Sequence, residues 1–180
     1  MIKIGVISDS HHKSDVAGSA INYLSDKKAD LIIHAGDIVE ISTLKALKNS
    51  KIPYVAVFGN NDNALKDYAK SFKIFKEPKI FNFKGLKIRL MHYPYYIKND
   101  VDIVIYGHTH YFAALKSDSS LILNPGEICG RKKPLYEFAI IEIYHDIGAL
   151  GDNSVLKFNV IKVQSKILKS PIWQEFSVEI

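Results

Sequence analysis

Short apolar runs and amphipathic stretches alternate along the first third of the chain. Residues 2–8, 31–35 and 52–58 are rich in Ile and Val and predict three buried strands. Between them, apolar residues recur at helical spacing over 14–26 and over 41–48, and the serine that begins the first stretch is the expected N-cap. This strand–helix order predicts parallel strands joined by helical crossovers.

The pattern changes after residue 79. Residues 79–83 and 86–91 flank a Lys84-Gly85 turn and predict a hairpin. Further strands are predicted at 101–106, 111–116, 120–123, 135–145 and 154–163. The second half is therefore expected to be mostly antiparallel. Both halves fit an α/β fold in which a two-sheet β sandwich is flanked by helices, in four layers (αββα). We expect one domain over 1–180, with the tail after about residue 165 outside these predicted elements.

Composition narrows the class of protein. With 180 residues, of which 47% are hydrophobic, the chain can build one substantial core. No apolar run approaches the roughly 20 residues of a membrane helix, and the N-terminus lacks a secretory signal, so no membrane association and a cytoplasmic location are expected. The single cysteine, Cys129, excludes an internal disulfide and a cysteine-based zinc cage.

The charge balance favours phosphate-bearing ligands. The formal net charge is +5 and the pI is about 9.1, which would attract anionic substrates. Nucleic acid is compatible with this charge, but no finger, basic zipper or single-strand aromatic signature supports it.

Polar residues follow five of the apolar strands, where ligand sites of α/β proteins form. Imidazole and carboxylate groups together suit Mn²⁺, Fe, Co²⁺, Ni²⁺ or Zn²⁺ better than Mg²⁺ or Ca²⁺. Glycines before three of the segments permit sharp turns and close backbone approach. The ordered set therefore predicts a metal site. The segments are Asp9-Ser10-His11, Gly36-Asp37, Gly59-Asn60-Asn61-Asp62, Met91-His92 and Gly107-His108-Thr109-His110.

This series, followed by Asn124-Pro125-Gly126-Glu127, resembles the calcineurin-like metallophosphoesterases, and among them the small YfcE-like, archaeal-type single-domain phosphodiesterases. The resemblance covers roughly residues 1–145. It implies a two-sheet sandwich flanked by helices, in agreement with the strand pattern.

The resemblance also implies the site. It assigns two divalent metal ions to seven ligands and makes Asp37, Asn60 and His92 central to catalysis. The reaction would be hydrolysis of a small-molecule phosphodiester by in-line attack of a metal-activated hydroxide. The first metal would be held by Asp9, His11 and His110, the second by Asn60, His92 and His108, and Asp37 would bridge both.

Four neighbouring residues are further candidates. Asp62 is expected to orient a histidine ligand, to cap a helix that begins near Ala64, or to do both. Asn61 occupies the position where larger relatives carry a proton-donating histidine. His12 either reaches the substrate or lies on the surface, and Arg131 could steer phosphate. Glu127 and Cys129 have no role that the sequence indicates.

The fourth segment departs from the family, which commonly has His-Gly-His where this chain has His92-Tyr93-Pro94. The stretch up to Asp100 is also short where relatives often carry a helix. Tyr93, Tyr95 and Tyr96 either line the substrate entrance or cover core that the missing helix would expose.

Two alternatives remain at this stage. The same fold serves as a non-catalytic scaffold in the retromer subunit, although eroded ligands would then be expected. A nuclease would use the same site on another substrate. The native metal, the physiological substrate and homo-oligomer formation cannot be read from the sequence.

Overall fold

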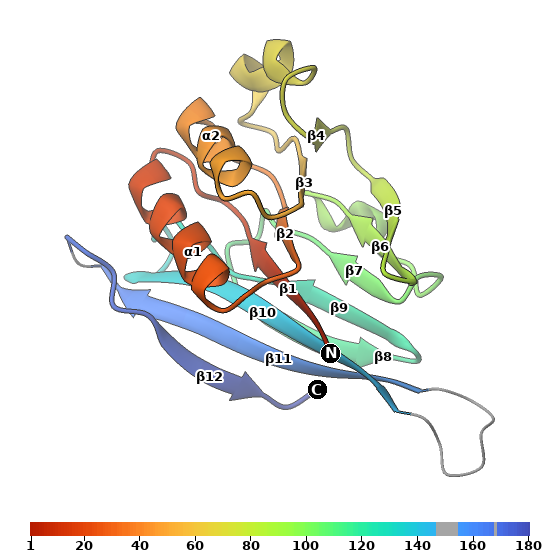
Figure 1. The fold of residues 1–180 in the computed structure, drawn as a ribbon. Coiled ribbons are helices and arrows are strands. Elements are labelled where there is room, and N and C mark those ends of the chain that lie inside the picture. Colours follow the sequence, from red (N-terminus) through yellow and green to blue (C-terminus); the bar gives the residue numbers. More distant parts are fainter. Residues whose placement is uncertain (147–154, 168) are drawn as a thin grey trace.

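The strands form two sheets in the computed structural model, which describes residues 1–146, 155–167 and 169–180 (Figure 1). The larger sheet has seven strands in the order β12-β11-β10-β1-β2-β3-β4. The strands β1 to β4 are parallel, and β10, β11 and β12 join them in antiparallel fashion. Their bounds are β1 Ile2–Ile7, β2 Leu31–His34, β3 Tyr54–Val57, β4 Ile74–Phe75, β10 Leu135–Asp146, β11 Val155–Lys166 and β12 Gln174–Val178.

The smaller sheet has five strands in the order β5-β6-β7-β9-β8. The predicted hairpin is present as β5 and β6, with left-handed conformations at Lys84 and Gly85 in its turn. The prediction of a mostly antiparallel second half is wrong for the centre of this sheet, because β6, β7 and β9 are parallel. Its strands are β5 Lys79–Phe83, β6 Leu86–Leu90, β7 Ile103–Ile105, β8 Ala113–Ser117 and β9 Ser120–Asn124.

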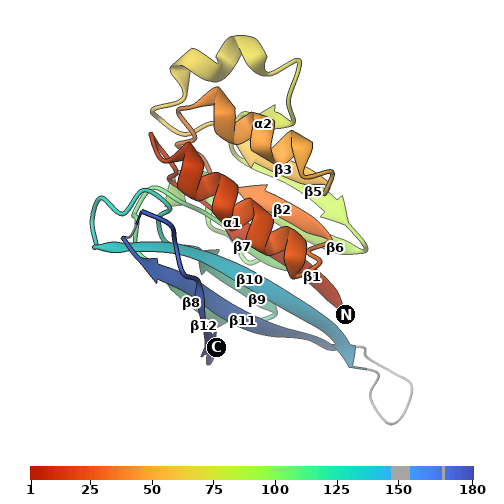
Figure 2. The same ribbon diagram turned by 60° about the vertical axis from the view of Figure 1, so that its left-hand side comes forward.

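Two α-helices cover the outer face of the seven-stranded sheet, as Figures 1 and 2 show. Helix α1 spans Ser14–Asp26 and helix α2 spans Ile41–Asn49. Their apolar stripes bury against β1, β2 and β10, with Leu24, Leu44 and Phe138 fully buried. Ser14 is not a cap, because Lys13 occupies the N-cap position and no side chain caps the helix.

The second core lies between the sheets. Side chains of alternating residues on β1 and β2 meet those of β6, β7 and β9 there, and most are fully buried, as are Val6, Ile33, Ile88 and Ile105. The two-sheet α/β fold is thus confirmed. On the outer face of the smaller sheet, Met91 and Val104 belong to a small third cluster, and the helical element that follows β6 is one short 3₁₀ helix, η2 Pro94–Tyr96.

The tail after Lys166 adds β12 to the edge of the larger sheet, which the sequence analysis left open. Trp173 packs edge-on against Phe138, with ring centroids 4.9 Å apart, and thereby covers part of the core next to α1. No helix among the described residues is long and apolar enough to cross a membrane.

Candidate metal centre

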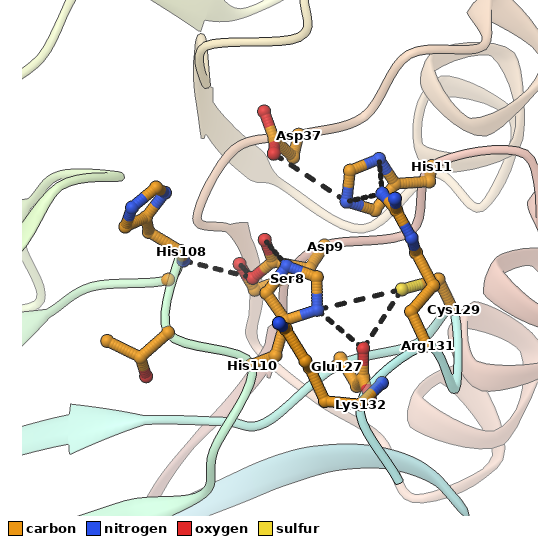
Figure 3. A network of polar contacts seen from close by, with 12 residues as sticks. Ser8, Asp9, His11, Asp37, His108, His110, Glu127, Cys129, Arg131 and Lys132 are labelled. Atoms are coloured by element: carbon orange, nitrogen blue, oxygen red, sulfur yellow. Dashed lines mark hydrogen bonds and ion pairs between the residues drawn. The ribbon is translucent and has the colours of Figure 1, made fainter. Parts of the chain in front are cut away.

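Five loops bring the predicted ligands together at the carboxyl ends of β1, β2, β3, β6 and β7. Two groups of potential ligand atoms form there, each with its members within 4.8 Å of one another. Asp9, Asp37 and His92 make one group, and His11, His110 and Cys129 make the other. Figure 3 shows the side chains of Asp9, His11, Asp37 and His110 facing a common space.

The Oδ2 oxygen of Asp37 lies near both His11 and His92, which belong to different ligand groups. It is 3.6 Å from Nε2 of His11 and 3.5 Å from Nε2 of His92. On the other side, Nε2 of His110 lies 3.3 Å from Oδ1 of Asp9. A single carboxylate is therefore shared between imidazoles that come from different loops.

Five of the seven predicted ligands have a left-handed backbone conformation. L-residues rarely adopt it, and each such residue costs on the order of 1–3 kcal/mol, which the surrounding structure must supply. Strain of this kind concentrates at functional sites because it fixes side-chain direction. The φ angles are 52° at Asp9, 43° at His11, 53° at Asp37, 66° at His108 and 65° at His110.

Two glycines allow these loops to approach closely. Gly36 has φ +93°, and a Cβ there would lie 2.6 Å from Nδ1 of His92. A Cβ on Gly59 would lie 2.3 Å from the backbone nitrogen of Asp37. Both distances are shorter than non-bonded atoms tolerate, so the ligands Asp37 and His92 need glycine beside them.

Asp9 is fully buried, and one of its oxygens accepts no hydrogen bond among the described residues, although Nε2 of His110 lies 3.3 Å from it. Its Oδ2 accepts hydrogen bonds from the Ser8 hydroxyl at 2.6 Å and from the His108 backbone at 3.1 Å. Its Oδ1 receives no hydrogen bond from any described residue. Burial raises the pKa of this carboxyl from 3.8 to about 6, against the opposing effect of the Ser8 hydrogen bond. A buried carboxylate oxygen without a donor is what a cation would satisfy.

His92 has its ring fixed by the backbone. Its Nδ1 lies 2.8 Å from the carbonyl oxygen of Ala35, an acceptor, so this nitrogen carries the proton. In the neutral ring Nε2 has a lone pair, and it faces Asn60 Oδ1 at 3.0 Å and Asp37 Oδ2 at 3.5 Å, which are also acceptors. Three acceptors in contact require a proton or a cation between them. Among the residues present, this arrangement fits a metal ion.

Behind His110, Glu127 performs a role that the sequence did not reveal. Its Oε2 lies 2.5 Å from Nδ1 of His110 and accepts from the Cys129 thiol at 3.1 Å (Figure 3). Its Oε1 accepts the backbone N–H groups of Lys132 and Lys133. Although burial alone would raise it, these donors lower the pKa of Glu127 to about 2. A carboxylate behind a histidine orients its other nitrogen towards a metal.

The same contact acts on His110. Burial would lower its pKa, but the hydrogen bond to Glu127 and the charge of Asp9 outweigh burial and raise it. The available signal for Glu127 was its place three residues after the end of β9, which repeats the pattern of a polar residue beyond a strand.

Asn61 and Asp62 make hydrogen bonds that support the proposed ligands and their loops. The Asn61 backbone N–H donates to Asp37 Oδ1 at 2.9 Å, and its side-chain amide donates to Oδ2 at 2.7 Å. Asp62 accepts from the backbone of Val39 and of Gly59, both at 2.7 Å. It makes no cap hydrogen bond to the 3₁₀ helix η1 Asn63–Tyr68, so the cap prediction is wrong; it ties two ligand loops together instead.

A pocket of about 510 Å³ opens beside the group formed by His11, His110 and Cys129. The guanidinium of Arg131 lies 3.4 Å from the His11 ring at this pocket. His12 is largely exposed and lies 3.3 Å from Glu40. Lys13 and Arg131 are both cationic, and two cationic residues at one pocket suit a phosphate group. The lining residues are His11, His12, Lys13, Val39, Asn61, Cys129 and Arg131.

His108 lies on the opposite side of Asp9 from His11 and Arg131 (Figure 3). Its ring packs at 5.1 Å from His92 and at 4.2 Å from Tyr93, measured between centroids. Burial and the neighbouring His92 lower the pKa of His108, so this imidazole is neutral and able to bind a metal near pH 7.

Comparison with known proteins gives the family of the chain. Residues 2–146 match the calcineurin-like phosphoesterase superfamily domain. A phosphodiesterase from Methanocaldococcus jannaschii is 34% identical over 144 residues, which cover 72% of this chain and 86% of that protein.

Solved structures share the fold. An archaeal phosphodiesterase superposes with a TM-score of 0.69 at 24% identity, covering 98% of this chain and 100% of that one. Wild-type Vps29 from Entamoeba histolytica, solved with Zn²⁺, gives a TM-score of 0.66 at 18% identity, covering 98% and 99% of the two chains. The family match and the level of identity together show that this chain belongs to the calcineurin-like phosphoesterase superfamily.

Proposed function

We propose that the chain is a phosphodiesterase that works with two divalent transition-metal ions. The observation that carries the proposal is the position of Asp37, whose Oδ2 lies within 3.6 Å of imidazole nitrogens from two different loops. The unsatisfied oxygen of Asp9 supports it independently. Asp9, His11 and His110 would hold one ion, Asn60, His92 and His108 the other, and Asp37 both.

The donor set suits borderline metals. Imidazoles outnumber carboxylates, which favours Mn²⁺, Fe, Co²⁺, Ni²⁺ or Zn²⁺ over ions that require only oxygen. Such ions would lower the pKa of water to near 7 and neutralise charge on the phosphoryl oxygens. The chain itself fixes the ligands by strained loops, and Arg131 would bind a non-bridging phosphoryl oxygen at the pocket.

The fold alone does not establish hydrolysis, because Vps29 shares it. A scaffold needs no ligand set, yet this chain keeps all seven predicted ligands and strains five of them. These features favour the enzyme over the scaffold. A nuclease would use the same residues, and the test below separates the two by substrate.

The proposal is tested by incubating metal-loaded protein with phosphodiesters, phosphomonoesters, DNA and RNA. We expect small phosphodiesters to be hydrolysed, and the activity to disappear with a chelator. Asp26→Asn, which changes an exposed carboxylate at the end of α1, serves as the matched control and should remain active. Absence of hydrolysis with every metal tested would favour the scaffold; cleavage of nucleic acid alone would favour the nuclease.

Glu127 gives a separate prediction about one metal position. Glu127→Gln removes the charge behind His110, and loss of such a supporting residue typically costs about 10–100-fold in metal affinity. We expect calorimetric titration with Mn²⁺ or Co²⁺ to show one weakened position and one unchanged. Glu175→Gln, which changes a surface carboxylate paired with Lys27, is the control. Equal weakening of both positions would show that the variant acts through general loss of structure.

The proton donor gives another prediction. The Asn61 amide is engaged with Asp37, and a carboxamide has no proton to transfer near pH 7. The rate of cleavage should then depend on how stable the leaving group is as an anion. Aryl diesters should be cleaved readily and alkyl diesters slowly. The measurement is kcat over methyl aryl diesters graded by leaving-group pKa. A flat series, with chemistry rate-limiting, would reveal a general acid, and His12→Ala would test whether it is His12.

A further inference from the structure

Two tyrosines form a stacked pair at the edge of the centre. The rings of Tyr93 and Tyr95 are nearly parallel, with an angle of 5° and centroids 5.0 Å apart. Tyr93 also packs on His108 at 4.2 Å and against the edge of His92 at 5.4 Å. A continuous set of rings therefore leads from the proposed second metal position outwards.

Core packing does not explain the outer ring. Tyr95 is 74% exposed, whereas Tyr93 is half-buried beneath it. No hydrogen bond of the Tyr95 hydroxyl is found among the described residues. The ring is carried by η2, whose first residue is Pro94, and the fixed φ of proline favours this helical turn. The alternative that these tyrosines cover exposed core applies to Tyr93, but not to Tyr95.

The two ends of the site differ in chemistry. Figure 3 shows His11 and Arg131 on one side of Asp9 and His108 on the other. The cationic pocket adjoins His11, and the tyrosine pair adjoins His108. A phosphodiester bound between them can place its charged phosphate towards Arg131 and one ester arm towards the tyrosines.

We propose that Tyr95, supported by Tyr93, binds a planar aromatic ring on one ester arm of the substrate. The inference rests on the proposed function, because that function places the phosphate between His11 and His108. Aromatic side chains bind flat rings of many kinds by stacking, and the contact is tolerant of ring identity.

The position of Tyr95 indicates that the aromatic ring on the ester arm is a nucleobase. Tyr95 is one ring further from His108 than Tyr93. A ring bonded directly to an ester oxygen stays near the phosphate, whereas a nucleobase is carried beyond it by the ribose. The outer tyrosine therefore suits a nucleoside arm, and the substrate class is a nucleoside phosphodiester.

The test measures binding to metal-loaded protein, independently of hydrolysis. Adenosine 5′-monophosphate carries the base, and ribose 5-phosphate is the same ligand without it. Tyr95→Ala should weaken adenosine 5′-monophosphate roughly 5- to 150-fold, the range that loss of one base–aromatic stack produces. Ribose 5-phosphate should bind unchanged. Tyr95→Phe keeps the ring and should bind both ligands like the wild type, and Tyr144→Ala, an exposed tyrosine of β10, should do the same.

The outcomes separate this inference from the proposed function. Equal weakening of both ligands by Tyr95→Ala, or no change in either, overturns the tyrosine site even if phosphodiesters are hydrolysed. A base-dependent loss supports it, whatever the hydrolysis panel shows for the activity itself. Thermal melting of Tyr95→Ala should match the wild type because the side chain is exposed, so that a change in binding is not a loss of fold.

Discussion

Asp37→Asn is expected to abolish most hydrolysis and to weaken both metal positions together. The substitution keeps the shape of the side chain but removes the negative charge that lies near His11 and His92. It also places an amide next to the Asn61 amide, which in the wild type donates to the Asp37 carboxylate. Loss of one preorganised electrostatic group typically lowers kcat by about 10²–10³-fold, and we expect at least that.

Comparison with a one-sided variant sharpens this prediction. His11→Ala should mainly weaken one of the two positions, since in the proposed arrangement His11 holds a single ion and Asp37 contacts both. Calorimetric Mn²⁺ titration of both variants, with Asp26→Asn as the control, distinguishes a shared ligand from an ordinary one. If Asp37→Asn weakened a single position, Asp37 would not bridge.

Asp9→Asn is expected to stabilise the metal-free protein at neutral pH. The folded-state pKa of Asp9 is raised to about 6 from 3.8, chiefly by burial. An acid with a raised pKa prefers its neutral form in the folded state, so ionisation destabilises the fold as pH rises from about 4 to about 6. The penalty is complete above that range and corresponds to about 3 kcal/mol.

An asparagine removes this penalty and keeps the contacts. Its oxygen can accept from Ser8 and His108, and its amide can donate to Nε2 of His110. In a chelator at pH 7.5, Asp9→Asn should raise the free energy of unfolding by up to about 3 kcal/mol, and the gain should vanish near pH 4.

Urea unfolding at several pH values, with and without metal, measures the effect. Metal that binds the folded state stabilises it more when its affinity is higher. Asp9→Asn should bind metal more weakly and therefore gain less stability from it than the wild type. A variant less stable than the wild type in chelator at pH 7.5 would mean that the Asp9 charge is satisfied without metal. This stability would come at the expense of function, as is common at binding sites.

The elements that sequence predicted well are the ones with strong local patterns. Helix α1 has the predicted bounds because its apolar residues recur over thirteen positions. β3 begins later than predicted because Pro53 has no N–H to donate to a neighbouring strand. β4 has two residues and β12 is largely exposed, so neither carries a periodic signal.

Pairing between distant segments could not be predicted in the same way. Buried strands such as β7 look alike whether their neighbours run parallel or antiparallel, because the pattern records burial and not direction. The proposed ligands could be selected from the sequence as a set because each of them follows a strand. Their supports were predicted only in part: Asn61 was a candidate, whereas Glu127 had no role that the sequence indicated. The contacts of Glu127 with His110 and of Asn61 with Asp37 exist only in the folded chain.

The central claim is a binuclear centre that hydrolyses phosphodiesters, and one titration tests it most directly. Metal-free protein is given Mn²⁺ in steps while hydrolysis of bis(4-nitrophenyl) phosphate is followed. We expect the rate to rise to a plateau near two ions per chain and to return to background with a chelator. A plateau at one ion, or a rate that never exceeds that of Mn²⁺ alone, would contradict the account.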